Sequence, residues 1–356
     1  MDCVGFQHTL CHVPSRHVTD YRTDNPGHAQ HAMRMNALNN EAETVPEATE
    51  TALHCEHPSY ASVPQYKSLD HAMRRHSNID VAVIACPPQF SQCYAEEALR
   101  RNLHVLMEKP PGLHRKGLEA LADVARSRNL TLFTGYHSAF CPCMNDMKRW
   151  VEENSISDVT IEWKESAAKW HPGQTWIMED TGLGVMDCLF DPFSILDELG
   201  IFTDEKCNGC SAVELVNSKL YLPRNWKSPI AGSSTFLFRD GSGGVSRKRQ
   251  IIADYAWNYE GSDDLWNISL TSEDGQTLEL VDGGSRLCVN GRMLDYRRKD
   301  NKTGTTDKLR LEYEALYHRF LDIVSKKDCY VRTMPLRVIN DILEQSEVQI
   351  IDPYAL

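Results

Sequence analysis

The clearest constraint on the fold is a run of apolar, mostly β-branched residues at 79–86, Ile-Asp-Val-Ala-Val-Ile-Ala-Cys, which Pro87 and Pro88 end at once. Such a run is typical of a strand buried on both faces of a parallel sheet. Two further strands are expected at 102–107 and 130–134, and helices at 68–75, 91–101 and 114–128. Because buried strands alternate with helices, the sequence predicts an α/β fold with a doubly wound parallel sheet.

A different pattern begins after Tyr136. Segments of alternating polarity between 213 and 296 are separated by turn pairs such as Asp274-Gly275 and Asn290-Gly291. This pattern predicts an α+β domain with a large, mainly antiparallel open sheet built from hairpins. A further strand is expected at 159–164.

The second half of the chain also contains helical patterns. Helices are expected at 142–153, 185–199, 309–326 and 335–348. In the helix at 309–326, Leu309, Leu316, Phe320 and Ile323 are expected to face inward. The sequence therefore predicts three parts: residues 1–135, of which 1–50 are divergent, residues 136–310, and C-terminal helices at 311–356 that pack back on the first part.

The composition is that of an acidic globular protein. The 356 residues are enough for about two domains. A balance of 38 Lys and Arg against 50 Asp and Glu gives a net charge of −12, which argues against nucleic acid and anionic membranes as partners. The 12 cysteines are not preceded by a secretory leader pattern, so we expect free thiols in a reducing cytoplasm. No apolar run reaches the roughly 18 residues of a membrane span.

Residues 1–50 differ from the rest of the chain. Only Gly5 and Gly27, of 20 glycines, lie in the first 111 residues, whereas 9 of the 14 histidines lie in the first 80. Pairs such as His8/His12 and His28/His31 have a spacing that could place two ligands on one helix face. No cysteine or carboxylate set accompanies them, so no metal site is predicted.

Candidate functional residues follow the predicted parallel strands. Ligands of open α/β sheets bind at the carboxyl ends of the strands. The residues at these ends are Cys86-Pro87-Pro88, Glu108-Lys109-Pro110 and Gly135-Tyr136-His137. A Glu-Lys pair in a loop is by itself an ordinary solvated charge pair, but its place directly after a buried strand indicates a site.

These motifs carry a family resemblance. The stretch from Asp80 to Gly135, with Asp-Val-Ala-Val-Ile-Ala-Cys-Pro-Pro and His-Val-Leu-Met-Glu-Lys-Pro, resembles the Gfo/Idh/MocA oxidoreductases. Trp-Lys-Glu at 163–165, Trp-His-Pro at 170–172 and Gly-Leu-Gly-Val-Met-Asp at 182–187 resemble the branch that contains the D-galactose and L-arabinose 1-dehydrogenases. The resemblance covers roughly residues 60–350.

The resemblance implies a Rossmann-like dinucleotide-binding domain at 1–135, a substrate domain at 136–310, and NAD or NADP as cofactor. It implies oxidation of the anomeric carbon of an aldose to the lactone, in a homodimer or homotetramer formed through the sheet face. Catalysis is assigned to Lys109 and Asp187. Sugar binding is assigned to Glu165, His171, Asp191, Trp170 and His137, and cofactor binding to Cys86, Pro87, Pro88, Glu108, Lys109 and Pro110.

The chemistry of this reaction suits these residue types. A carboxylate can take the proton of the C1 hydroxyl while an ammonium favours the developing negative charge. Each residue also has a plain structural interpretation: Asp187 as a helix cap, Glu165 as a salt-bridge partner, His171 as a loop histidine. Asp191 lies four residues after Asp187, so the two carboxylates share a helix face, and we expect Asp191 to be the protonated partner of Asp187.

The sequence departs from the family at the dinucleotide site. A glycine-rich turn normally follows the first strand and lets the backbone approach the pyrophosphate, and residues 1–50 contain none. Either these residues are a divergent replacement of the nucleotide-binding half, or the chain binds its cofactor weakly or not at all. The alternative function is therefore a catalytically impaired sensor of sugar or dinucleotide. Glycoside cleavage with a retained dinucleotide is a third possibility.

Overall fold

The computed structural model describes residues 66, 68–76, 78–204, 210–211, 213–238, 249–297 and 308–356. The chain divides into two compact units, and the described residues from Asp80 onward belong to the second. In the first unit, α2 (Leu69–Arg75) is capped by Ser68, whose Oγ accepts a hydrogen bond from His71 N over 3.1 Å. The divergent residues 1–50, with the histidine pairs, lie outside the described residues.

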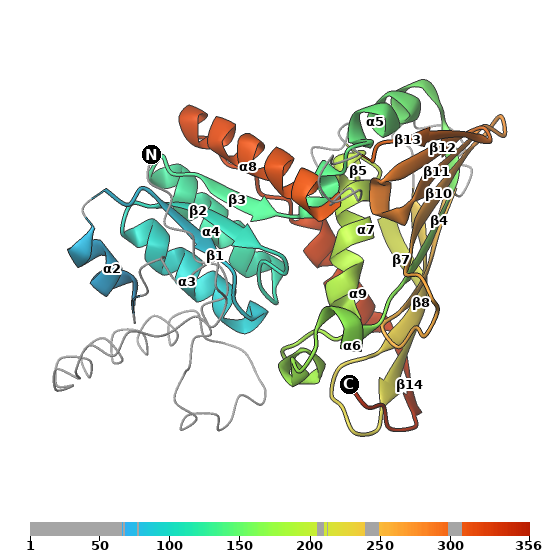
Figure 1. Cartoon of the computed structure of the whole chain (residues 1–356), viewed down its shortest axis with the longest axis horizontal. Helices are drawn as coiled ribbons and strands as arrows, with labels where there is room; N and C mark the ends of the chain where they lie inside the picture. The colour runs from blue at the N-terminus through green and yellow to red at the C-terminus, as the bar shows by residue number, and fades with distance from the viewer. Residues whose placement is uncertain are drawn as a thin grey trace. The chain divides into compact units, whose positions relative to one another are not determined.

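The second unit begins with a three-stranded parallel sheet, which confirms the predicted order of strands and helices (Figure 1). Its strands are β1 (Val81–Ile84), β2 (His104–Glu108) and β3 (Leu132–Gly135), with α3 (Pro88–Arg100) and α4 (Arg115–Ser127) between them. Helix α3 begins at Pro88, three residues before the predicted start, because proline is well suited to the first position of a helix.

The other sheet of this unit has nine strands in the order β13-β12-β11-β10-β4-β9-β8-β7-β14. The strands are β4 (Ile156–Lys164), β7 (Val213–Pro223), β8 (Ala231–Phe238), β9 (Arg249–Ala256), β10 (Leu265–Ser272), β11 (Thr277–Val281), β12 (Arg286–Val289), β13 (Arg292–Asp295) and β14 (Glu347–Ile351). Most neighbours are antiparallel, as predicted, whereas β4–β9 and β7–β14 are parallel. A small ribbon pairs β5 (Thr203–Asp204) with β6 (Cys210–Ser211).

Strand β14 replaces the end of a predicted helix. The helix expected at 335–348 is α9 (Met334–Gln345), after which Ser346 is extended and β14 pairs with β7. The apolar residues Val348 and Ile350 alternate with polar neighbours, which suits a strand, and both are exposed. The short segment was assigned to the helix because it follows the helical pattern without a glycine or proline between them.

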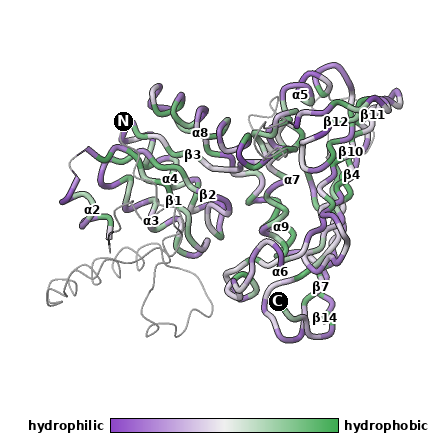
Figure 2. Tube along the Cα trace, viewed as in Figure 1, coloured by the Kyte–Doolittle hydropathy of each residue, from purple (hydrophilic) through white to green (hydrophobic). Residues whose placement is uncertain are grey.

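Helices α7 (Met186–Glu198) and α9 lie on one face of the nine-stranded sheet (Figure 1). The remaining helical segments are η3 (His137–Phe140), α5 (Met144–Glu153), α6 (Ala167–Trp170), η4 (Thr175–Met178) and η6 (Asp282–Gly284). Figure 2 shows hydrophobic and hydrophilic residues interspersed along the strands of this sheet, in agreement with the burial of every second residue from Ile268 to Ser272 in β10. The apolar side chains on the covered face pack against α7, which is buried over nearly its whole length.

Helix α8 (Lys308–Lys326) packs against the parallel sheet. Leu316, Phe320 and Ile323 are buried as predicted and form one cluster with Leu106 of β2 and Phe133 of β3. The prediction for Leu309 is wrong, because this side chain is 47% exposed. The buried stripe of α8 begins one turn later than predicted, at Glu312, so Leu309 in the first turn precedes it.

Two general expectations can be compared with the described residues. The cysteines whose side chains the structure describes carry free thiols. Within the same part of the chain, no helix combines the length and the apolar character needed to cross a membrane.

The α8 cluster predicts a stability effect. Phe320→Ala should lower the free energy of unfolding by about 3–5 kcal/mol, because the ring is buried against Phe133 and its removal leaves a cavity. Leu321→Ala is the matched control: this neighbour is 43% exposed and its truncation should change stability by less than about 0.5 kcal/mol. Urea unfolding followed by tryptophan fluorescence measures both, and equal effects would contradict the packing.

Candidate functional site

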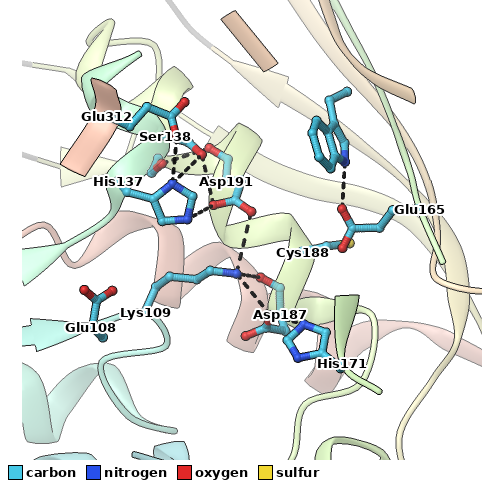
Figure 3. A network of polar contacts seen from close by, with 12 residues as sticks. Glu108, Lys109, His137, Ser138, Glu165, His171, Asp187, Cys188, Asp191 and Glu312 are labelled. Atoms are coloured by element: carbon cyan, nitrogen blue, oxygen red, sulfur yellow. Dashed lines mark hydrogen bonds and ion pairs between the residues drawn. The ribbon is translucent and has the colours of Figure 1, made fainter. Parts of the chain in front are cut away.

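The centre of the site is an ion pair between Lys109, at the end of the parallel sheet, and Asp187, on the helix that lies against the nine-stranded sheet. Lys109 follows directly after β2, and its Nζ lies 3.0 Å from Oδ2 and 3.3 Å from the main-chain O of Asp187, in the first turn of α7 (Figure 3). The same Nζ lies 3.6 Å from Oδ2 of Asp191, one helical turn further on. The structure therefore brings the two predicted catalytic residues into contact and adds Asp191 to them.

The start of α7 depends on a residue without a side chain. Gly184 has a φ of +54°, and a Cβ at this position would lie 2.2 Å from the main-chain O of Pro229. The next residue, Val185, donates its N–H to the same oxygen over 2.8 Å. Only glycine allows this close approach at a positive φ, and the approach fixes where α7 begins, with Asp187 in its first turn.

The three central groups stabilise one another's charges. Burial works against the charged form of Lys109, but Asp187 and Asp191 hold its pKa well above the usual value. Burial likewise disfavours the ionised form of Asp191, but Lys109 and His137 bring its pKa below the usual value. The structure thus favours an ionised Asp191, in contrast to the protonated carboxyl that the spacing of the two aspartates led us to expect.

Two histidines lie at opposite ends of this group. His137, in η3, has Nδ1 2.9 Å from Glu312 Oε2 and Nε2 3.5 Å from Asp191 Oδ1. Burial opposes its charge, but the two carboxylates raise its pKa. His171 Nε2 lies 3.6 Å from Asp187 Oδ2, and burial lowers its pKa, so the neutral form is favoured there.

Glu165 is bound by two indoles and not by a salt bridge. It follows β4, is buried, and accepts hydrogen bonds from Trp257 Nε1 at 2.7 Å and Trp266 Nε1 at 2.6 Å, one on each carboxyl oxygen. Burial raises its pKa to about 7 although the two indole donors favour the ionised form. Glu165 therefore changes charge near neutral pH.

Trp170 lies beside Trp266, one of the two indoles that bind Glu165, and not beside Lys109. Its ring centroid is 5.3 Å from that of Trp266, its Nε1 donates to Asp264 Oδ2 over 3.2 Å, and the side chain is 42% exposed. The partly exposed ring of Trp170, with Lys169 Nζ 5.0 Å from its centroid, therefore lies next to one of the two indoles that bind Glu165.

The residues predicted to hold a dinucleotide lie at the carboxyl ends of β1 and β2. Cys86 and Pro87 lead into α3, where Pro88 is buried, and Pro110 is buried after Lys109. Glu108 accepts a hydrogen bond from Tyr313 OH over 3.2 Å, and burial raises its pKa.

This edge fits a nicotinamide dinucleotide as far as it is described. The carboxyl ends of β1 and β2 lie side by side, and Lys109, after β2, contacts α7 there. Gln89, in the first turn of α3, has a buried Oε1 that accepts no hydrogen bond from the described residues. That oxygen could accept a hydrogen bond from the carboxamide of a nicotinamide. Residues 1–50, in which the sequence lacks the glycine-rich turn that normally binds the pyrophosphate, lie outside the described residues.

Several residues of the site were not predicted from the sequence. Ser138 donates to Asp191 Oδ1 over 3.1 Å, Glu312 contacts His137, and Trp257 and Trp266 bind Glu165. Glu312 could have been suspected, because it lies four residues before Leu316 on the apolar stripe of α8, where a carboxylate is unusual. The two tryptophans carry no comparable signal in the sequence.

Comparisons with known proteins agree with the fold. Residues 21–136 match the model of an oxidoreductase family with an NAD-binding Rossmann fold. The chain is 28% identical to galactose 1-dehydrogenase of Pseudomonas fluorescens, over 78% of this chain and 81% of that protein. The crystal structure of D-galactose-1-dehydrogenase from Rhizobium etli matches with a TM-score of 0.70 and 26% identity, over 85% and 87% of the two chains.

A more distant structure shows the fold alone. The 3-ketoreductase KijD10 from Actinomadura kijaniata, in complex with NADP and TDP-benzene, has a TM-score of 0.58 at 14% identity, over 79% of this chain and 82% of that chain. The family match starts at residue 21, inside the stretch in which we placed no strand from the sequence.

The environment of Glu165 predicts a titration near neutral pH. In protein labelled with ¹³C at glutamate side chains, one carboxyl should titrate at about pH 7 and disappear in Glu165→Gln. Because its pKa is raised on folding, ionising Glu165 costs stability as the pH rises from about 4.5 to about 7. Trp266→Phe removes a donor to the carboxylate and should raise the pKa further.

A control for this titration is Glu162→Gln. Glu162 lies three residues before Glu165, on β4, and its carboxylate contacts Lys164 Nζ at 3.3 Å, so its replacement should leave the resonance of Glu165 in place. If the resonance assigned to Glu165 titrates in the usual acidic range, the described environment is wrong.

Proposed function

We propose that the chain is a member of the Gfo/Idh/MocA oxidoreductase family, which its sequence resembles, and that it is an NAD(P)-dependent sugar 1-dehydrogenase. The reaction would oxidise the anomeric carbon of an aldose of the galactose or arabinose type to the lactone. The observation that carries the proposal is the buried Lys109–Asp187 pair at the carboxyl ends of the parallel strands. Similarity to galactose 1-dehydrogenase over 78% of the chain supports a sugar as substrate.

Asp187 is the group that would take the proton from the C1 hydroxyl. Its buried carboxylate lies 3.0 Å from Lys109 Nζ, so the ammonium would contact the same hydroxyl oxygen and favour the negative charge that develops on it. A bound nicotinamide would supply the hydride acceptor. Neutral His171, beside Asp187, has one donor and one acceptor nitrogen and can bind a sugar hydroxyl without adding charge.

The sugar would be recognised on the side of α7 and β4. Asp191 and His137 offer charged partners for hydroxyl groups, and Glu165 can donate or accept because its pKa is about 7. Trp170 would offer its exposed ring to the C–H face of the sugar. A site with this many polar groups discriminates strongly against sugars that leave one of them unpaired.

The dinucleotide, NAD or NADP, would lie along the ends of β1 and β2. Cys86, Pro87 and Pro88 follow one strand, and Glu108, Lys109 and Pro110 end the other, so both sets border the crevice in which cofactors of such sheets bind. Lys109 would then contact both ligands. In the same proposal, the chain assembles as a homodimer or homotetramer through the face of the nine-stranded sheet.

A sensor of sugar or dinucleotide is the second candidate function. It is favoured by one observation, the lack of a glycine-rich turn in residues 1–50. Calorimetric titration with NAD and with NADP distinguishes the two: tight binding without turnover of any aldose would support the sensor, and binding with turnover the enzyme.

The dehydrogenase proposal predicts the effect of two substitutions. Asp187→Asn and Lys109→Ala should each lower kcat for aldose oxidation by about 10²–10⁴-fold, because one removes the base and the other the group that stabilises the developing charge. Formation of reduced nicotinamide is measured with galactose, arabinose, fucose, xylose and glucose. Lys164→Ala, which removes a lysine paired with Asp254 at 2.6 Å, is the control and should retain activity. Full activity of Asp187→Asn would disprove the assignment.

A further inference from the structure

A series of contacting side chains, alternately acidic and basic, connects α8 to the proposed catalytic pair. Glu312 Oε2 lies 2.9 Å from His137 Nδ1, and His137 Nε2 lies 3.5 Å from Asp191 Oδ1. The other oxygen of Asp191 lies 3.6 Å from Lys109 Nζ, which in turn contacts Asp187 at 3.0 Å (Figure 3). Acidic and basic side chains thus alternate along this series, from Glu312 on α8 to Asp187 at the reacting centre.

Glu312 is the most buried of these contacting side chains. Its side chain is 0% exposed, and its contacts are His137 on one oxygen and Lys308 Nζ, at 3.3 Å, on the other. A buried carboxylate is costly unless it is paired, so its position opposite the imidazole favours a cationic His137. Lys308 is partly exposed, and its side chain also lies over the ring of Trp266.

The groups that face His137 come from three elements. They are Asp191 of α7, Glu312 and Tyr313 of α8, Glu108 and Lys109 at the end of β2, and the neighbouring Ser138. The only cation among them is Lys109, whereas Glu312 and Asp191 both contact the imidazole. Removal of Glu312 therefore removes the closer of the two carboxylates that hold the ring.

We propose that Glu312 is a positioning residue that keeps His137 oriented and cationic, so that His137 shares Asp191 with Lys109 and leaves the Lys109 ammonium paired with Asp187. The distances agree with this division, since Lys109 lies closer to Asp187 than to Asp191. With a neutral His137, the full charge of Asp191 would attract Lys109 and weaken the pair at the reacting centre. The expected effect on turnover rests on the dehydrogenase function proposed above.

The first test measures His137 itself. In protein labelled with ¹³C at histidine and free of sugar and dinucleotide, NMR titration should give His137 a raised pKa, assigned by its loss in His137→Gln. Glu312→Gln should lower this pKa by about one unit or more, equivalent to a tenfold change in proton affinity, and Glu312→Asp should restore part of it. Glu314→Gln, on the exposed side of α8 and paired with Arg310, is the control and should leave it unchanged.

Lys308→Met provides a test of opposite sign. It removes a partly exposed cation next to Glu312, so the pKa of His137 should rise, and a fold defect is less of a concern than for a change at the buried carboxylate. An unchanged or lower pKa in this variant, or an unchanged pKa in Glu312→Gln, would overturn the inference whatever the protein's activity.

The second test measures turnover as a function of pH. In Glu312→Gln, kcat for aldose oxidation should fall at neutral pH and recover at lower pH, where His137 is protonated again, while KM changes little. A loss of kcat that is the same at every pH would indicate a purely structural role and contradict the proposal. If the wild-type chain oxidises no aldose, the proposed function fails, but the histidine titration still decides the role of Glu312.

Discussion

The Lys109–Asp187 contact is the interaction on which the arrangement of the site depends. Burying two charges costs several kcal/mol per ion, and the contact is tolerable only because further partners complete it. Asp191 adds a second carboxylate to Lys109, and the main-chain O of Asp187 accepts from the same ammonium. Because Lys109 comes from the end of β2 and both aspartates come from α7, this pair links the parallel sheet to the helix that covers the nine-stranded sheet.

The site separates its carboxyl groups into two electrostatic environments. Asp191 lies between two basic groups, which lower its pKa, whereas Glu165 accepts hydrogen bonds from two indole N–H groups and has a pKa of about 7. A difference of this kind lets two chemically similar groups hold different protonation states at one pH. Asp191 therefore keeps its negative charge near neutral pH, whereas the charge of Glu165 can change when a ligand binds.

Sequence reasoning recovered the elements that follow from local patterns. The buried run at 79–86 predicted β1, and the parallel order of β1–β3 followed from it. The catalytic roles of Lys109 and Asp187 were assigned through the family resemblance, whereas their contact comes from the structure, since 78 residues separate the two in the chain. Glu312 was missed because a charged side chain is expected to face solvent, although its position falls on the apolar stripe of α8; the tertiary contact with His137 explains its burial.

Strand β14 has a consequence for the edge of the nine-stranded sheet. It pairs over residues 347–351 with Lys219–Pro223 of β7, so this part of the edge of β7 is already paired. A chain from which β14 was deleted would expose Lys219–Pro223 as an open edge on which other strands could add. The C-terminal strand therefore protects the sheet from edge-to-edge aggregation, and its own exposed Val348 and Ile350 would limit how far that protection extends in concentrated solution.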